Sequence, residues 1–132
     1  MSYLLDTNVW LRLVEDPERL SAKVHAVVSE TGNYPLGLSA ISPWAVAKKV
    51  SKGLLDLSLP VEKWMARALQ DTFIVLQPLT PEIAVESCRL PGDFHNDPAD
   101  QIIAATARMH DLTLLTSDRR LLDYSHVRAV WD

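Results

Sequence analysis

An apolar stretch at residues 3–5 begins almost at the start of the chain and stops abruptly at Asp6, Thr7 and Asn8. The apolar stretch predicts a buried strand. Any of the three polar residues can cap a helix that begins at once, and apolar side chains recur at helical spacing over 9–14. A buried strand that runs directly into a helix is typical of the opening of a parallel α/β unit.

The same alternation continues along the chain. Further strands are predicted at Leu36–Leu38, Phe73–Leu76, Leu112–Leu115 and Val127–Trp131. Apolar residues recur at helical spacing between and after these strands. Helices are therefore predicted at 18–29, 43–53, 60–69, 80–88, 97–107 and 119–123. Strands separated by one or two helices predict an α/β fold, with a mostly parallel central sheet of four to five strands and helices on both faces.

Length, charge and cysteine content limit the class of protein. A length of 132 residues predicts one domain over residues 1–132. No apolar run is long enough to cross a membrane and Asp6 interrupts the first one, so we expect neither an anchor nor a signal peptide. The single Cys88 fits a reducing cytoplasm. The net charge of −4 argues against a protein that coats nucleic acid, but not against an enzyme that acts on it.

Acidic residues stand where the predicted strands end and the predicted helices begin. Asp6 and Asp118 directly follow strands, and Asp97 and Asp100 open a helix. The carboxyl ends of parallel strands and the amino ends of the following helices share one edge, so all four carboxylates are candidates for one cleft. Clustered carboxylates repel, and Mg²⁺ or Mn²⁺ relieves that repulsion. Such a site suits the hydrolysis of a nucleic-acid backbone.

Each of these carboxylates also has a purely structural interpretation. Asp6, Asp97 and Asp118 can act as helix caps, and Asp100 can complement a helix dipole. The functional interpretation gains weight only because all four fall on one predicted edge.

Four segments resemble the motifs of a known family. They are Leu5-Asp6-Thr7-Asn8, Ser39-Ala40-Ile41-Ser42-Pro43-Trp44, the stretch from Asp97 to Ala107, and Leu115-Thr116-Ser117-Asp118. Together they resemble the motifs of PIN-domain ribonucleases, in the order and spacing of the VapC-type toxins of bacterial toxin–antitoxin pairs. The resemblance implies a Rossmann-like PIN domain and a metal-dependent endoribonuclease that uses Mg²⁺ or Mn²⁺.

The resemblance also assigns roles to residues. It implies that Asp6 and Asp100 bind the metal directly, that Asp97 lies close by, and that Asp118 binds a second ion or acts through water. Residues that would orient these groups by hydrogen bonds are Thr7, Asn8 and Thr116. Thr116 can equally be an ordinary strand-end residue.

Position 45 departs from the family pattern. After Ser42, Pro43 and Trp44 the family usually has an acidic residue, most often Glu, whereas this chain has Ala45. We expect Ser42 to cap the helix with Pro43 at its first position, which places residue 45 in the first turn. The chain is either an engineered active-site variant, which the otherwise intact motif favours, or a natural divergent member. In both cases we expect a folded but poorly active protein.

Basic residues near the motifs are candidates for contact with RNA phosphates. Arg119 and Arg120 follow Asp118 directly, and Lys48 lies on the helix after the second motif, where a solvated face is the alternative. His95 precedes Asp97 and could approach the metal or the substrate, although a loop histidine is usually just exposed.

The resemblance further implies an RNA substrate, a homodimer and a cognate, VapB-like antitoxin. A second interpretation is a non-catalytic PIN-like module that keeps only antitoxin or RNA binding, which Ala45 favours. A third is a phosphoacceptor or phosphohydrolase domain with Asp6 as nucleophile. This is the weakest, because Thr7 and Asn8 follow Asp6 in place of a second carboxylate.

Overall fold

The computed structural model describes residues 1–70 and 73–132, and its centre is a five-stranded sheet. The strands are β1 (Tyr3–Leu5), β2 (Leu36–Ser39), β3 (Ile74–Gln77), β4 (Thr113–Leu115) and β5 (Ala129–Val130). Their order across the sheet is β3-β2-β1-β4-β5, and every pairing is parallel. The predicted parallel sheet is therefore confirmed, with the first strand at its centre.

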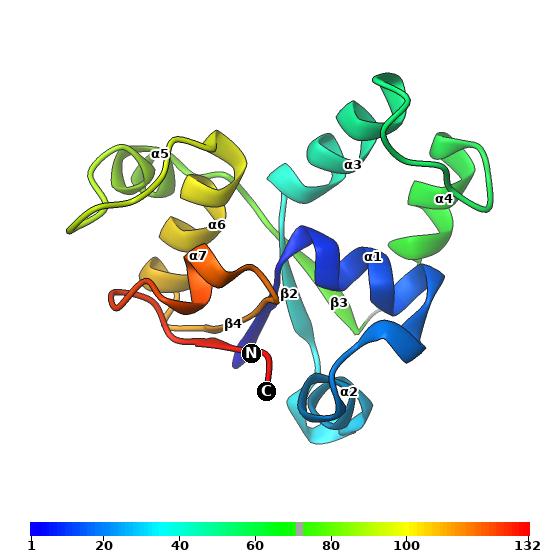
Figure 1. The fold of residues 1–132 in the computed structure, drawn as a ribbon, viewed down its shortest axis with the longest axis horizontal. Coiled ribbons are helices and arrows are strands. Elements are labelled where there is room, and N and C mark those ends of the chain that lie inside the picture. Colours follow the sequence, from blue (N-terminus) through cyan, green and yellow to red (C-terminus); the bar gives the residue numbers. More distant parts are fainter. Residues whose placement is uncertain (71–72) are drawn as a thin grey trace.

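Helices cover both faces of this sheet. They are α1 (Thr7–Glu15), α2 (Ala22–Ser29), α3 (Ile41–Ser51), α4 (Val61–Ala68), α5 (Pro81–Ser87), α6 (Pro98–Met109) and α7 (Arg119–Leu122), with short 3₁₀ turns at Pro17–Arg19 and Thr31–Asn33. In Figure 1, α1, α3 and α4 lie to the right of the sheet and α5, α6 and α7 to the left. No helix in the described part of the chain is long and apolar enough to span a membrane.

The central strand is buried on both sides, which explains its continuous apolar sequence. Successive side chains of a strand point to opposite faces. Leu5 accordingly packs in the core beneath α1, α2 and α4, together with Trp10 and Trp64, whose rings meet edge-on at 5.0 Å between centroids. Leu4 packs in the second core with Ile103 of α6. The sheet thus lies between two apolar layers. Polar side chains can gather instead at the ends of its strands.

The structure corrects the predicted start of α3. The helix begins at Ile41, and the hydroxyl of Ser39 at the end of β2 accepts the backbone N–H of Ile41 at 3.1 Å. Ser42 is therefore not the cap. Its buried hydroxyl instead shares a hydrogen bond of 2.9 Å with the hydroxyl of Thr7. Because the helix starts earlier than expected, residue 45 lies beyond its first turn, and an acidic residue there would not complete a capping box.

Other boundaries differ by smaller amounts. The helix predicted over 18–29 is interrupted, because the hydroxyl of Ser21 accepts the N–H of Val24 and starts α2 there. The last strand is limited to Ala129–Val130, and the third begins at Ile74 rather than at Phe73.

The sheet core sets the stability of the fold. Leu114 of β4 is fully buried, whereas Leu54 lies in a loop with 74% of its surface exposed. We expect Leu114→Ala to lower the free energy of unfolding by about 2–5 kcal/mol, through lost burial and an unfilled cavity. The matched change Leu54→Ala should alter it by less than about 0.5 kcal/mol. Urea unfolding followed by circular dichroism measures both, and equal effects would contradict this account of the core.

Candidate active site

A cavity of about 160 Å³ opens at the carboxyl edge of the sheet. The residues that line it are Asp6, Thr7, Asn8, Ala45, Lys49, Asp97, Ala99, Asp100, Asp118 and Arg120. The structure thus places all four carboxylates singled out in the sequence around one cavity. They come together because the N-termini of α1, α6 and α7 meet where β1 and β4 end.

Three of the four carboxylates cap helices as well as line the cavity. Each of the three accepts a hydrogen bond from a backbone N–H through a carboxylate oxygen. The N–O distances are 2.8 Å from Thr7 to Asp6, 3.1 Å from Asp100 to Asp97, and 2.9 Å from Arg120 to Asp118. The structural and functional interpretations are compatible, because a carboxylate has two oxygens and several lone pairs. Capping fixes these side chains at the cavity before any ligand arrives.

Asp6 is the most deeply buried of the acids, with 5% of its surface exposed. Its second oxygen accepts the hydroxyl of Thr116 at 2.7 Å, and this hydroxyl in turn accepts the N–H of Asp118 at 3.0 Å. Burial raises the pKa of Asp6 to about 6, helped by the negative charge of Asp100 and opposed by the hydrogen bond from Thr116. Burial thus deprives the ionised carboxylate of Asp6 of hydration and opposes its ionisation.

Asp100 and Asp118 are tied to basic neighbours. One oxygen of Asp100 lies 2.7 Å from Nε2 of His95 and 3.4 Å from Nη2 of Arg120, which also lies 3.1 Å from Asp118. Burial raises the pKa of Asp100, and the hydrogen bond from His95 opposes this. For Asp118, burial acts upward, but the hydrogen bonds and charge of Arg120 hold its pKa below the ordinary value. Arg120 thus balances part of the negative charge.

The residues expected to orient the acids act in different ways. Thr116 contacts Asp6 directly. Thr7 contacts Asp6 through its backbone N–H, while its hydroxyl joins α1 to α3 through Ser42. The side-chain oxygen of Asn8 accepts a hydrogen bond of 3.3 Å from Lys49.

Lys49 is the lining residue that sequence reasoning missed. It is half-buried at the cavity, whereas Lys48 is exposed and is not among the lining residues. Residues four apart share a helix face, so the spacing from position 45 could have pointed to Lys49. Arg119 lies outside the lining as well, and forms an exposed ion pair with Asp123 at 3.6 Å.

The donor set is suited to a hard divalent cation. Carboxylate oxygens are the ligands that Mg²⁺ and Mn²⁺ prefer. Within residues 1–70 and 73–132, no three His, Cys, Asp or Glu side chains form a ready-made cage. Mg²⁺ does not require one, because it usually binds through one or two carboxylates and keeps several waters. Asp6 and Asp100, with Asp97 and Asp118 nearby, fit such an ion.

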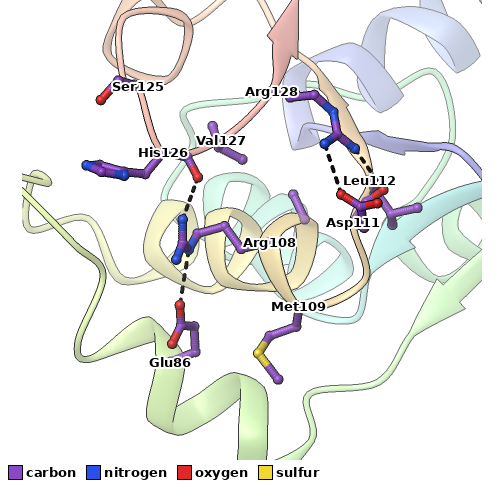
Figure 2. Close-up of a pocket in the computed structure, with 10 residues that line it drawn as sticks. Glu86, Arg108, Met109, Asp111, Leu112, Ser125, His126, Val127 and Arg128 are labelled. Carbon is purple, nitrogen blue, oxygen red and sulfur yellow. Dashed lines mark hydrogen bonds and ion pairs between the residues drawn. The ribbon is translucent and has the colours of Figure 1, made fainter.

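A larger cavity, of about 480 Å³, lies elsewhere, between α5, α6 and the segment before β5. Figure 2 shows that Arg108 lies between the carboxylate of Glu86, at 3.0 Å, and the backbone carbonyl of His126, at 2.6 Å. Arg128 pairs with Asp111 at 2.9 Å. Both guanidinium groups thus serve internal contacts, and none of the four acids of the smaller cavity lines this one.

The fold and the smaller cavity define a parallel α/β domain with an acidic, oxygen-lined site at the carboxyl edge of its sheet. Residues 3–127 match the PIN domain family, and the chain belongs to this family.

Relatives and solved structures agree with this assignment. Ribonuclease VapC22 of Mycobacterium tuberculosis (strain ATCC 25618 / H37Rv) is 33% identical over 127 residues, which cover 96% of this chain and 95% of that protein. The fold resembles VapBC2 from Rickettsia felis bound to a DNA fragment from the promoter, with a TM-score of 0.71, 17% identity and 100% of both chains covered. It also resembles a toxin–antitoxin complex from Klebsiella pneumoniae, with a TM-score of 0.67 and 22% identity. That match covers 96% of this chain and 95% of the other.

The buried charge of Asp6 predicts a pH dependence of stability in the metal-free protein. With a pKa of about 6 against 3.8 when exposed, the folded state binds the proton more tightly than the unfolded state. This contribution to stability is complete below pH ~4 and is lost as the pH rises through ~6, by on the order of 3 kcal/mol. Asp6→Asn should remove that loss. Urea unfolding in EDTA at several pH values measures it, and parallel profiles for the two proteins would contradict the assignment.

Proposed function

We propose that this protein is a metal-dependent endoribonuclease, the toxin of a toxin–antitoxin pair. The observation that carries the proposal is the gathering of Asp6, Asp97, Asp100 and Asp118 around one cavity that also contains basic side chains. The 33% identity to Ribonuclease VapC22 supports RNA as the substrate. Of the three sequence interpretations, this one gives a role to all four acids and to the basic side chains beside them.

The side chains at the cavity have distinct tasks in this proposal. Asp6 and Asp100 hold Mg²⁺ or Mn²⁺, and Asp97 and Asp118 contribute negative charge or bind through water. A divalent cation bound there supplies positive charge to the phosphodiester and makes an attacking water more acidic. Thr116 fixes the orientation of Asp6. The positive charges of Lys49 and Arg120 are placed to bind the RNA backbone.

The partners follow from the same proposal. The Rickettsia felis and Klebsiella pneumoniae structures are described as VapBC2 and as a toxin–antitoxin complex, which supports binding of a cognate, VapB-like antitoxin by this chain. A basic antitoxin residue would complement the acidic cavity. We further propose a homodimer that acts in the cytoplasm, where the exposed thiol of Cys88 would stay reduced.

Ala45 suggests that activity is attenuated. It lines the cavity on the side of α3, facing a cluster that already contains the four acids. A glutamate at this position would bring a further carboxylate to the cation or to the attacking water. The second candidate function, a PIN-like module that binds without cleaving, is favoured by this single residue.

Restoring the acidic residue tests the proposed chemistry. We expect Ala45→Glu to raise Mg²⁺- or Mn²⁺-dependent RNA cleavage by on the order of 10²-fold, because groups of this kind typically matter that much. Cleavage of a labelled RNA with and without EDTA gives the measurement.

Ala47→Glu is the matched control, since Ala47 is exposed on the same helix and does not line the cavity. It should leave the rate unchanged, and Asp100→Asn added to Ala45→Glu should abolish the gain. If Ala45→Glu gives no metal-dependent cleavage, the binding-module interpretation is preferred.

Two adjacent lysines provide a test of the RNA-binding surface. Lys49 is half-buried at the cavity and Lys48 is exposed beside it, and both carry the same charge. We expect Lys49→Met to weaken RNA binding and to reduce the slope of log K against log salt by about 0.7, the value for one lost contact on a single strand. Lys48→Met should have a smaller effect. Fluorescence anisotropy in Ca²⁺ buffer measures both, and a larger effect of Lys48→Met would move the RNA path away from Lys49.

A further inference from the structure

His95 makes a closer contact with the acidic cavity than its place in a loop suggests. It lies between α5 and α6, and its Nε2 atom is 2.7 Å from one oxygen of Asp100. The two side chains are only 19% and 15% exposed. Of the two interpretations of His95 in the sequence, an approach to the cavity or an exposed loop position, the structure therefore favours the first.

The ring of His95 is held in place from several directions. It stacks on Phe94, with centroids 4.5 Å apart and planes inclined by 20°, and Phe94 in turn meets Tyr124 edge-on. The hydroxyl of Tyr124 donates to the carbonyl of Pro91, and the side-chain amide of Gln101 donates to the carbonyl of His95 at 3.0 Å. The loop is thus fixed on both sides of the histidine, and the imidazole is presented to Asp100 in one orientation.

This contact divides the work between the two oxygens of Asp100. Oδ2 receives both His95 and Arg120, whereas Oδ1 makes no hydrogen bond in the part of the chain that the structure describes. A carboxylate held by one oxygen cannot rotate freely, so its other oxygen keeps a defined direction. Hydrogen bonds of this kind to a ligating carboxylate typically set metal affinity.

We propose that His95 is a positioning residue that fixes the carboxylate of Asp100 for the divalent cation. The inference rests on the proposed metal-dependent function and goes beyond it, because it assigns the orientation of the ligand to a residue outside the acidic cluster. Nε2 donates its hydrogen to Asp100, and the stacked Phe94 prevents the ring from turning away. This role differs from a purely structural one in the loop, because it makes metal affinity depend on a hydrogen-bond donor at the position of Nε2.

A pair of substitutions that differ by one methylene tests this dependence. The amide nitrogen of Gln reaches about as far from the backbone as Nε2 of His, whereas that of Asn reaches only as far as Nδ1. We expect His95→Asn to weaken Mn²⁺ binding by about 10-fold or more. His95→Gln should restore binding to within about threefold of the unchanged chain. Isothermal titration with Mn²⁺ alone gives the affinities, and thermal unfolding of each variant shows that it is folded.

His126→Asn is the matched control, because the ring of His126 also packs on an aromatic neighbour, Tyr124, but His126 is not among the residues that line the acidic cavity. It should leave Mn²⁺ affinity unchanged. If His95→Asn binds Mn²⁺ as the unchanged chain does, or if His95→Gln is as weak as His95→Asn, the positioning role is wrong while the proposed function stands. If the unchanged chain does not bind Mn²⁺, the proposed function fails, and this inference fails with it.

Discussion

The register of β1 against β4 is the constraint on which the site depends. Leu5 pairs with Leu115, and the next backbone hydrogen bond runs from the N–H of Asp6 to the carbonyl of Leu115 at 3.0 Å. This pairing brings Asp6 beside Thr116 although 110 residues separate them. A shift by one residue would turn every side chain of the strand to the opposite face. The two apolar cores exclude that shift, so the packing of leucines determines where the carboxylates meet.

The electrostatic cost of the site is concentrated at Asp6, which is buried at the end of the central strand. Asp6 is buried beside Asp100 and Asp118, and like charges in such a place oppose ionisation. Arg120 offsets part of this repulsion at the open side, but it contacts Asp100 and Asp118 and not Asp6. The negative charge of Asp6 is therefore not balanced by Arg120. A small cation bound beside Asp6 would stabilise its ionised form.

Much of this arrangement could be predicted from the sequence, for physical reasons that differ between elements. Strand β1 was predictable because burial on both faces leaves a continuous apolar run, and Asp6, Asp97 and Asp118 because caps mark helix starts. The start of α3 was not, because Ser42 followed by Pro43 has the pattern of a cap, and only the tertiary contact of its hydroxyl with Thr7 gives it a different role. The contact of His95 with Asp100 depends on aromatic packing in a loop, which has no periodic signal.

Three of the acids both cap a helix and line the cavity, which affects how the acidic cluster can be altered by substitution. Losing the cap at Asp6, Asp97 or Asp118 also weakens the start of a helix, which typically costs about 1 kcal/mol. Position 45 carries no such obligation, since alanine suits the interior of α3 and its side chain only borders the cavity. An acidic residue at position 45 could therefore be exchanged for alanine without the loss of a helix cap, so the folded frame around the cavity does not depend on which of the two residues stands there.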